Sequence, residues 1–156
     1  MSTYEQSVAA IDKRIVTEAA YAKAADAKLA EAIAAANAAI ANATADAAAA
    51  KVAERAQADA REFATHAASA NSGAEKAAKQ HYYLQKYHDD YDHNINCSEW
   101  SFSWNRNEFY FEALDAYKAF LRMNGCKVKQ EENRQDDVVV YVTRQPFYKN
   151  MLCILL

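Results

Sequence analysis

The chain has 156 residues, a formal net charge of −3, and 52% hydrophobic residues. Its 18 basic and 21 acidic residues are interspersed, so the sequence provides no long-range field that would draw it to nucleic acid or to an anionic membrane. Only two glycines are present, and they are far apart, which excludes a glycine-rich phosphate-binding loop and the nucleotide hydrolysis that depends on one.

The composition changes sharply near Gly73. Alanine dominates the chain before this point, whereas all three cysteines and both tryptophans follow it. This contrast predicts two domains, an alanine-rich helical oligomerisation arm over residues 1–72 and a small α+β domain over residues 73–156. Chains divided in this way are common among accessory or structural proteins of viruses and mobile elements, and we keep that origin as a hypothesis.

The arm is expected to be helical because alanine occupies roughly every second position over residues 19–70, without glycine or proline. Its larger apolar residues begin with a seven-residue spacing, as at Val8 and Ile15, but Ile33 then follows Leu29 by four. A spacing that drifts in this way is typical of a nearly straight helix rather than of a strict heptad repeat.

Two arrangements of the arm fit this pattern. We favour a continuous rod over residues 4–70, roughly 100 Å long at ~1.5 Å per residue. The alternative is a helical hairpin that folds back near Asn42, in which Thr44 caps a second helix and Asp46 lies in its first turn. In both cases small apolar faces remain to be covered, so the sequence predicts a coiled-coil-like homo-oligomer formed through the arm.

The compartment is predicted from the cysteines and from the apolar runs. Cys97, Cys126 and Cys153 are odd in number and widely spaced, which suits reduced thiols and a cytoplasmic location. Residues 32–50 are long enough to cross a bilayer, but they are mostly alanine and include Asp46, so we expect no membrane span.

The second domain shows helical and strand patterns in alternation. A helix stop is expected at residues 71–73, where Gly73 can adopt a left-handed conformation. Trp100, Phe102 and Trp104 alternate with serines, which is typical of a half-buried strand. The pattern predicts helices over 73–91 and 108–123, strands over 98–105, 126–130 and 138–142, and a strand or short helix over 147–156. We expect 138–142 to be central in a mostly antiparallel sheet that packs against one or two helices.

Histidines and carboxylates cluster between residues 81 and 93, and both are ligands of zinc, manganese and iron. The spacing does not favour a site, because His88 and His93 are five residues apart and so do not share a helical face. We therefore assign no catalytic residue and no cofactor, and keep a metal-dependent hydrolase or nuclease as the alternative function. Its candidate ligands are His81, His88, Asp89, Asp92 and His93.

A second alternative is a single-stranded nucleic-acid-binding module. The rings of Trp100, Phe102 and Trp104 could stack on bases beside Lys127 and Lys129. The same rings are what a sheet needs to pack against its helix, so core packing is the favoured interpretation and a nucleic-acid partner is disfavoured.

The sequence contains no motif that assigns a reaction, and we expect a protein that is not an enzyme. The favoured function is an oligomeric structural or interaction protein, in which the arm mediates self-assembly and the α+β domain binds a protein or other macromolecular partner. Tyrosine and arginine dominate such interfaces. The expected contact residues are Tyr82, Tyr83, Tyr87, Tyr91 and Arg106.

Overall fold

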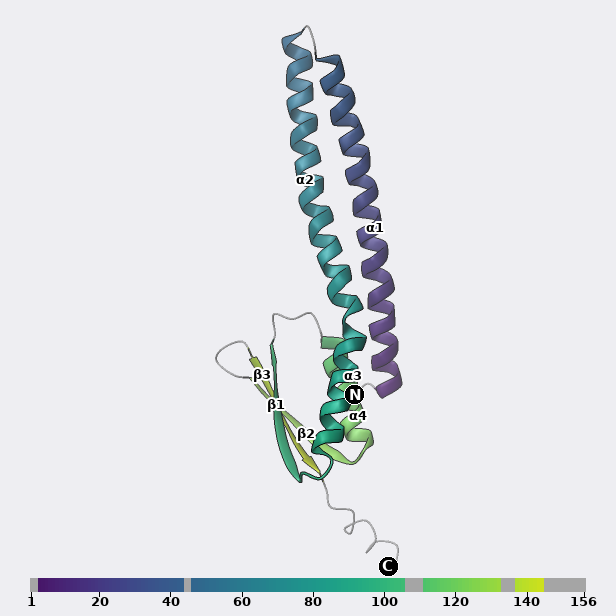
Figure 1. The fold of residues 1–156 in the computed structure, drawn as a ribbon, viewed down its shortest axis with the longest axis vertical. Coiled ribbons are helices and arrows are strands. Elements are labelled where there is room, and N and C mark those ends of the chain that lie inside the picture. The colour runs from purple at the N-terminus through teal and green to yellow at the C-terminus, as the bar shows by residue number, and fades with distance from the viewer. Residues whose placement is uncertain (1–2, 44–45, 106–110, 133–136, 145–156) are drawn as a thin grey trace, which may run out of the picture. The chain divides into compact units, whose positions relative to one another are not determined.

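The computed structural model describes residues 3–43, 46–105, 111–132 and 137–144, and its fold class is α+β, as the sequence predicts. Its elements, in chain order, are α1 (Tyr4–Asn42), α2 (Ala47–Ala78), α3 (Gln80–Asn94), β1 (Glu99–Asn105), α4 (Phe111–Met123), β2 (Cys126–Glu132) and β3 (Asp137–Arg144) (Figure 1). They form two compact units. One unit is Lys13–Ala78, and the other combines Met1–Asp12 with Lys79–Leu156.

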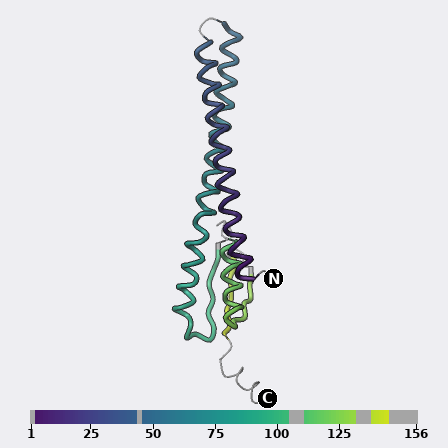
Figure 2. Tube along the Cα trace, turned by 90° about the vertical axis from the view of Figure 1, so that its right-hand side faces the viewer, coloured from purple at the N-terminus to yellow at the C-terminus, as the bar shows by residue number. Residues whose placement is uncertain are grey.

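The unit Lys13–Ala78 is an antiparallel helical hairpin. Its parts of α1 and α2 run alongside each other in Figure 1, and they overlap in the view of Figure 2, which is turned by 90°. The side-chain amide of Asn71 on α2 donates a hydrogen bond to Asp26 on α1, with 2.9 Å between Nδ2 and Oδ1. The continuous rod that we favoured is therefore wrong, and the hairpin alternative is the observed arrangement.

The chain reverses without the help of glycine or proline. Helix α1 ends at Asn42, and α2 begins at Ala47. The carboxylate of Asp46 accepts a hydrogen bond of 3.1 Å from the backbone N–H of Ala48, which caps α2. The capping role that we expected for Thr44 concerns a residue outside the described part of the chain.

Alanine forms the interface between the two helices. The deeply buried positions are separated by three, seven or fourteen residues along each helix, so they share one helical face. They are Ala22 and Ala36 on α1 and Ala53, Ala67, Ala70 and Ala77 on α2. The predicted drift is thus wrong for the buried face, because Ile33, which suggested it, is 45% exposed.

Gly73 lies within α2 and does not stop it. A Cβ atom at this position would lie 3.2 Å from the Oε2 atom of Glu18 on α1. The absence of a side chain at Gly73 therefore leaves room for the Glu18 carboxylate, although glycine costs about 1 kcal/mol relative to alanine in a helix. The helix stop predicted at 71–73 is wrong. Helix α2 continues to Ala78, and α3 begins at Gln80 rather than at Gly73.

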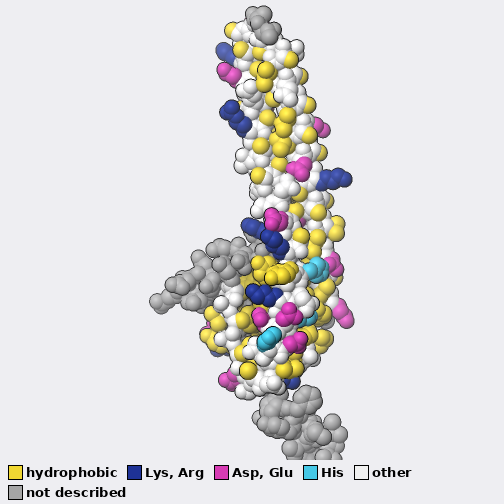
Figure 3. Space-filling model, viewed as in Figure 1, with side chains coloured by type: hydrophobic (Ala, Val, Ile, Leu, Met, Phe, Trp, Pro, Cys, Tyr) yellow, Lys and Arg dark blue, Asp and Glu magenta, His cyan; other side chains and the backbone are white. Residues whose placement is uncertain are grey.

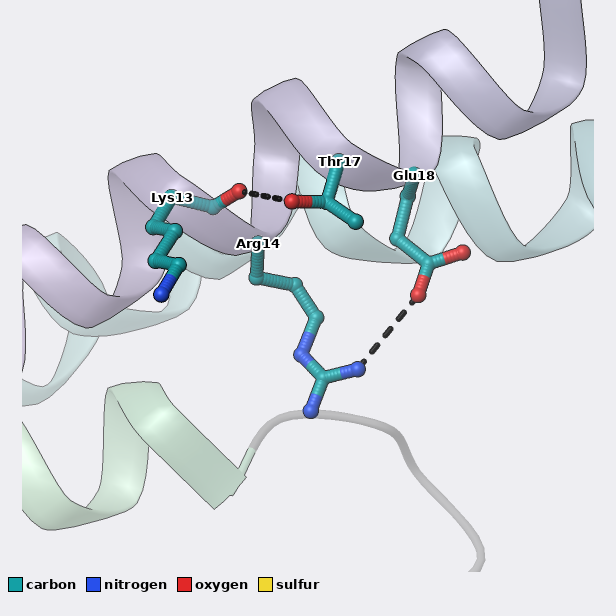
Figure 4. Close-up of polar contacts among 4 residues, drawn as sticks. All are labelled: Lys13, Arg14, Thr17 and Glu18. Carbon is teal, nitrogen blue, oxygen red and sulfur yellow. Dashed lines mark hydrogen bonds and ion pairs between the residues drawn. The ribbon is translucent and has the colours of Figure 1, made fainter.

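The polar contacts drawn in Figure 4, on the surface of α1, are local and weak. On α1, Arg14 Nη1 lies 3.4 Å from Glu18 Oε1, and the Thr17 hydroxyl donates a 2.8 Å hydrogen bond to the carbonyl of Lys13 (Figure 4). An exposed ion pair four residues apart on a helix contributes about 0.3–0.5 kcal/mol. Alanine packing, rather than these pairs, must therefore provide most of the contact energy that closes the hairpin.

The second unit contains a three-stranded antiparallel sheet with the order β1-β3-β2, so the predicted central position of β3 is confirmed. One face of the sheet is buried, with Trp104, Val138, Val140 and Val142 each no more than 3% exposed. Ring contacts from α3 and α4 cover this face. Gly125 follows the end of α4 and has a positive φ of 79°, which is typical of a glycine that terminates a helix.

The predicted strands 98–105, 126–130 and 138–142 and the helix 108–123 agree with β1, β2, β3 and α4 within a few residues. The predicted element at 147–156 lies outside the described residues. Among the described helices, none combines the length and the apolar character needed to cross a membrane.

Candidate functional site

Tyr117 of α4 is the centre of an aromatic cluster in the α+β unit. It is 1% exposed, and its ring stacks on Tyr87 of α3 at a centroid distance of 5.0 Å. The ring of Phe102 on β1 meets Tyr117 edge-on at 5.4 Å, and Trp104 lies 5.1 Å from Tyr87. Burial is the main cause that raises the pKa of Tyr117 above its ordinary value. These rings join both helices to the sheet.

Two of the expected contact tyrosines belong to this packing rather than to an open surface. Tyr87 contacts the cluster directly, and Tyr91, which is 7% exposed, meets Phe120 edge-on at 5.2 Å. By contrast, Tyr82 is 66% exposed and lies against the half-buried Tyr83 at 5.4 Å. Tyr82 is therefore the expected contact residue most available to a partner.

Arg106, the remaining expected contact residue, lies outside the described part of the chain. The structure therefore supplies a position for four of the five expected contact residues.

The predicted metal ligands are not brought together. His81 Nε2 lies 2.7 Å from Asp12 Oδ1, whereas His93 Nδ1 contacts the backbone carbonyl of Asp89 at 2.8 Å. His88 instead stacks on Phe120 at 4.2 Å. Within the described ranges there is no group of three or more histidine, cysteine, aspartate or glutamate side chains arranged to hold a metal ion. The geometry gives the metal-dependent hydrolase no support.

His88 has an unusual environment among these histidines. Its Nε2 atom is buried and has no hydrogen-bond partner among the described residues. Desolvation lowers the pKa of His88, and this effect outweighs the opposite influence of Asp92 and Asp89. The neutral imidazole is thus the form that the folded unit prefers.

This preference predicts an acid sensitivity of the α+β unit. The pKa of His88 is lower in the folded than in the unfolded chain, so its contribution to stability is present above pH ~6.5 and is lost as the pH falls through the folded pKa. Chemical denaturation between pH 7.5 and 5 should show a smaller pH dependence for His88→Gln than for the parent chain. An unchanged slope in His88→Gln would contradict the assignment.

The stacking platform required for nucleic-acid binding is not formed in the described structure. Trp100, Phe102 and Trp104 pair in register with Val142, Val140 and Val138 and share the buried face. The register places Lys129 beside Tyr141 and Ser101, which are on the opposite face because side chains alternate along a strand. The rings and the lysines that the alternative requires are therefore on different sides of the sheet.

The sequence interpretation missed a cavity of about 150 Å³ beside the aromatic cluster. Its lining comes from α3, β1 and α4: Tyr87, Asp90, Asn94, Trp100, Ser101, Phe102 and Tyr117. Two spacings could have indicated it. Asp90 and Asn94 are one helical turn apart, and Trp100 and Phe102 are on the same side of one strand.

The hairpin carries a different kind of candidate surface. Large apolar side chains remain exposed on it, and hydrophobic side chains are visible along the hairpin (Figure 3). These exposed residues are Val16, Tyr21, Ile33, Ile40, Val52 and Phe63, with exposed fractions between 37% and 69%. A hollow of about 270 Å³ lies between Tyr21, Lys28, Phe63 and His66.

Comparison of this chain with known protein families, with characterised proteins and with solved structures finds no match.

Proposed function

We propose that this chain is a non-enzymatic assembly protein, in which the helical hairpin associates with further copies and the α+β unit binds a macromolecular partner. The observation that carries the proposal is that the buried and the exposed apolar residues of the hairpin differ in size. Alanine forms the contact between α1 and α2, while six larger apolar side chains remain exposed. Single exposed apolar residues are common, but several on one helix pair favour an interface.

Ile33 and Ile40 are the best-defined part of this surface. They are seven residues apart on α1, so they share one helical face, and each is 45% exposed. Complete burial of an isoleucine side chain stabilises by about 1.5–3 kcal/mol. Two partly exposed isoleucines per chain can therefore contribute substantially to association of hairpins.

The partner-binding role of the α+β unit is inferred from a single exposed residue. Tyr82 is 66% exposed on α3, and tyrosine is among the residues that contribute most to protein interfaces. A cytoplasmic location is part of the same proposal, because Cys97 and Cys126 are both free thiols in the described structure.

The double substitution Ile33→Gln/Ile40→Gln should weaken self-association at least about tenfold, because it removes apolar area while glutamine preserves helix propensity. Sedimentation equilibrium over a wide range of concentrations measures this change. Ala34→Gln/Ala41→Gln is the matched control, since both alanines are exposed and lie one residue further along the same helix. A parent chain that remains monomeric at every concentration would refute the assembly proposal.

A further inference from the structure

The cavity of about 150 Å³ in the α+β unit has a lining with a definite chemical character. Four of its residues are aromatic, namely Tyr87, Trp100, Phe102 and Tyr117, and Asp90 provides the only formal charge. No lysine or arginine is among the described residues that line it. A carboxylate beside the negative faces of aromatic rings disfavours an anion and favours a cation.

Several of the polar groups that line the cavity can accept hydrogen bonds. The side-chain Nδ2 of Asn94 donates to the backbone carbonyl of Asp90 at 2.8 Å, which leaves its Oδ1 atom as an acceptor. The carboxylate of Asp90 accepts only, and the hydroxyl oxygen of Tyr117 has a lone pair available in addition to its contact with Trp100. Three acceptor groups therefore line the same small space.

We propose that this cavity binds a primary alkylammonium group, the terminal group of a lysine side chain or of a free aliphatic amine. A primary ammonium has three N–H donors, which match the acceptors of Asp90, Asn94 and Tyr117, while the aromatic rings contact its alkyl carbons. A quaternary ammonium would satisfy the rings but leave these acceptors without donors. The volume suits such a group, since a cavity of about 150 Å³ holds a molecule the size of benzene.

The test is an NMR titration of the full chain with n-butylammonium at constant ionic strength. The indole N–H of Trp100 and the side-chain amide of Asn94 report on the site directly. We expect saturable shifts of both resonances, with an affinity in the millimolar range of about 1–10 mM for so small a ligand. Tetramethylammonium should bind at least about tenfold more weakly, because it has no N–H donor. Absence of saturable shifts, or equal or tighter binding of tetramethylammonium, overturns the proposal.

Asp90→Asn removes the charge and should weaken n-butylammonium binding at least about tenfold. Asp92→Asn is the matched control, because Asp92 is an exposed carboxylate on the same helix and does not line the cavity. Equal weakening in both variants would show a general charge effect and would overturn the assignment. If Asp90→Asn does not fold, the relative affinities of the parent chain for n-butylammonium and tetramethylammonium still test the proposal.

The same titration distinguishes the two sources of the ammonium group. A lysine derivative blocked at both backbone ends that binds as tightly as n-butylammonium assigns the cavity to a lysine side chain of a partner. If the lysine derivative does not bind and n-butylammonium does, the cavity is assigned to a free amine. Both results support the ammonium site, and neither depends on whether the hairpin assembles.

Discussion

Replacement of Tyr117 by alanine is expected to unfold the α+β unit under conditions in which the parent chain is folded. Tyr117 is 1% exposed and contacts rings from α3, β1 and its own helix. Removal of a large buried aromatic side chain costs about 3–5 kcal/mol. A domain of this size has a total stability of about 5–13 kcal/mol, at ~0.05–0.15 kcal/mol per residue, so this single change removes a large fraction of it.

Near-ultraviolet circular dichroism measures this effect, because both tryptophans lie in the α+β unit. Tyr117→Phe is the control, since it keeps the ring that stacks on Tyr87 and removes only the hydroxyl. We expect Tyr117→Phe to retain the parental near-ultraviolet spectrum and Tyr117→Ala to lose it. A Tyr117→Ala chain with the parental spectrum and the parental melting temperature would show that the ring is not central to this core.

The second large effect is expected at the alanine interface of the hairpin. Ala67 is 3% exposed, and leucine at this position adds three carbon atoms to a contact made by small side chains. Overpacking of a well-packed core costs about 1–3 kcal/mol. Ala67→Leu should therefore lower the denaturant midpoint of the chain measured by far-ultraviolet circular dichroism at 222 nm, where the helical signal is strongest.

Ala68→Leu provides a matched control for this substitution. Ala68 is the next residue on α2 and is exposed, so the same change should alter stability by less than about 0.5 kcal/mol. Equal midpoints for Ala67→Leu and Ala68→Leu would mean that the side facing α1 is not closely packed. A higher midpoint for Ala67→Leu would indicate a loose interface that leucine fills.

The α+β unit was predictable because its residue types differ strongly along the chain. Trp100, Phe102 and Trp104 alternate with serines, and the β-branched run at Val138–Val142 identifies the central strand. Gly125 marks the end of α4 through its positive φ. In each case a single local feature has one dominant structural explanation.

The hairpin arrangement of the arm could not be predicted from such local features of the sequence. When alanine occupies most positions, the buried face differs little in hydrophobicity from the exposed one, and the bulky residues that draw attention, such as Ile33 and Ile40, are partly exposed. The reversal between α1 and α2 contains neither glycine nor proline, whereas Gly73, the strongest expected stop, lies within a continuous helix. The space beside Gly73 faces the carboxylate of Glu18 on α1, and the glycine forms no turn.

The candidate sites, too, could be predicted only in part from the sequence. The histidine and aspartate cluster is dense in sequence, but helical geometry separates its members, so that His81 contacts Asp12 and His88 stacks on Phe120. The ammonium-sized cavity combines residues of α3, β1 and α4, and their proximity depends on tertiary packing. Local spacing could have paired Asp90 with Asn94, but it could not have placed Tyr117 beside them.

The central claim is that α1 and α2 of one chain close on each other as a hairpin, and crosslinking of Asp26→Cys/Asn71→Cys tests it most directly. These side chains are in contact in the hairpin, with 2.9 Å between Asn71 Nδ2 and Asp26 Oδ1, whereas a continuous helix would separate them by roughly 70 Å at ~1.5 Å per residue. After treatment with a short bismaleimide and denaturation, peptide mapping should identify a link between positions 26 and 71 in a species of monomer mass. The absence of this link, or its presence only in species of dimer mass, would contradict the intramolecular hairpin.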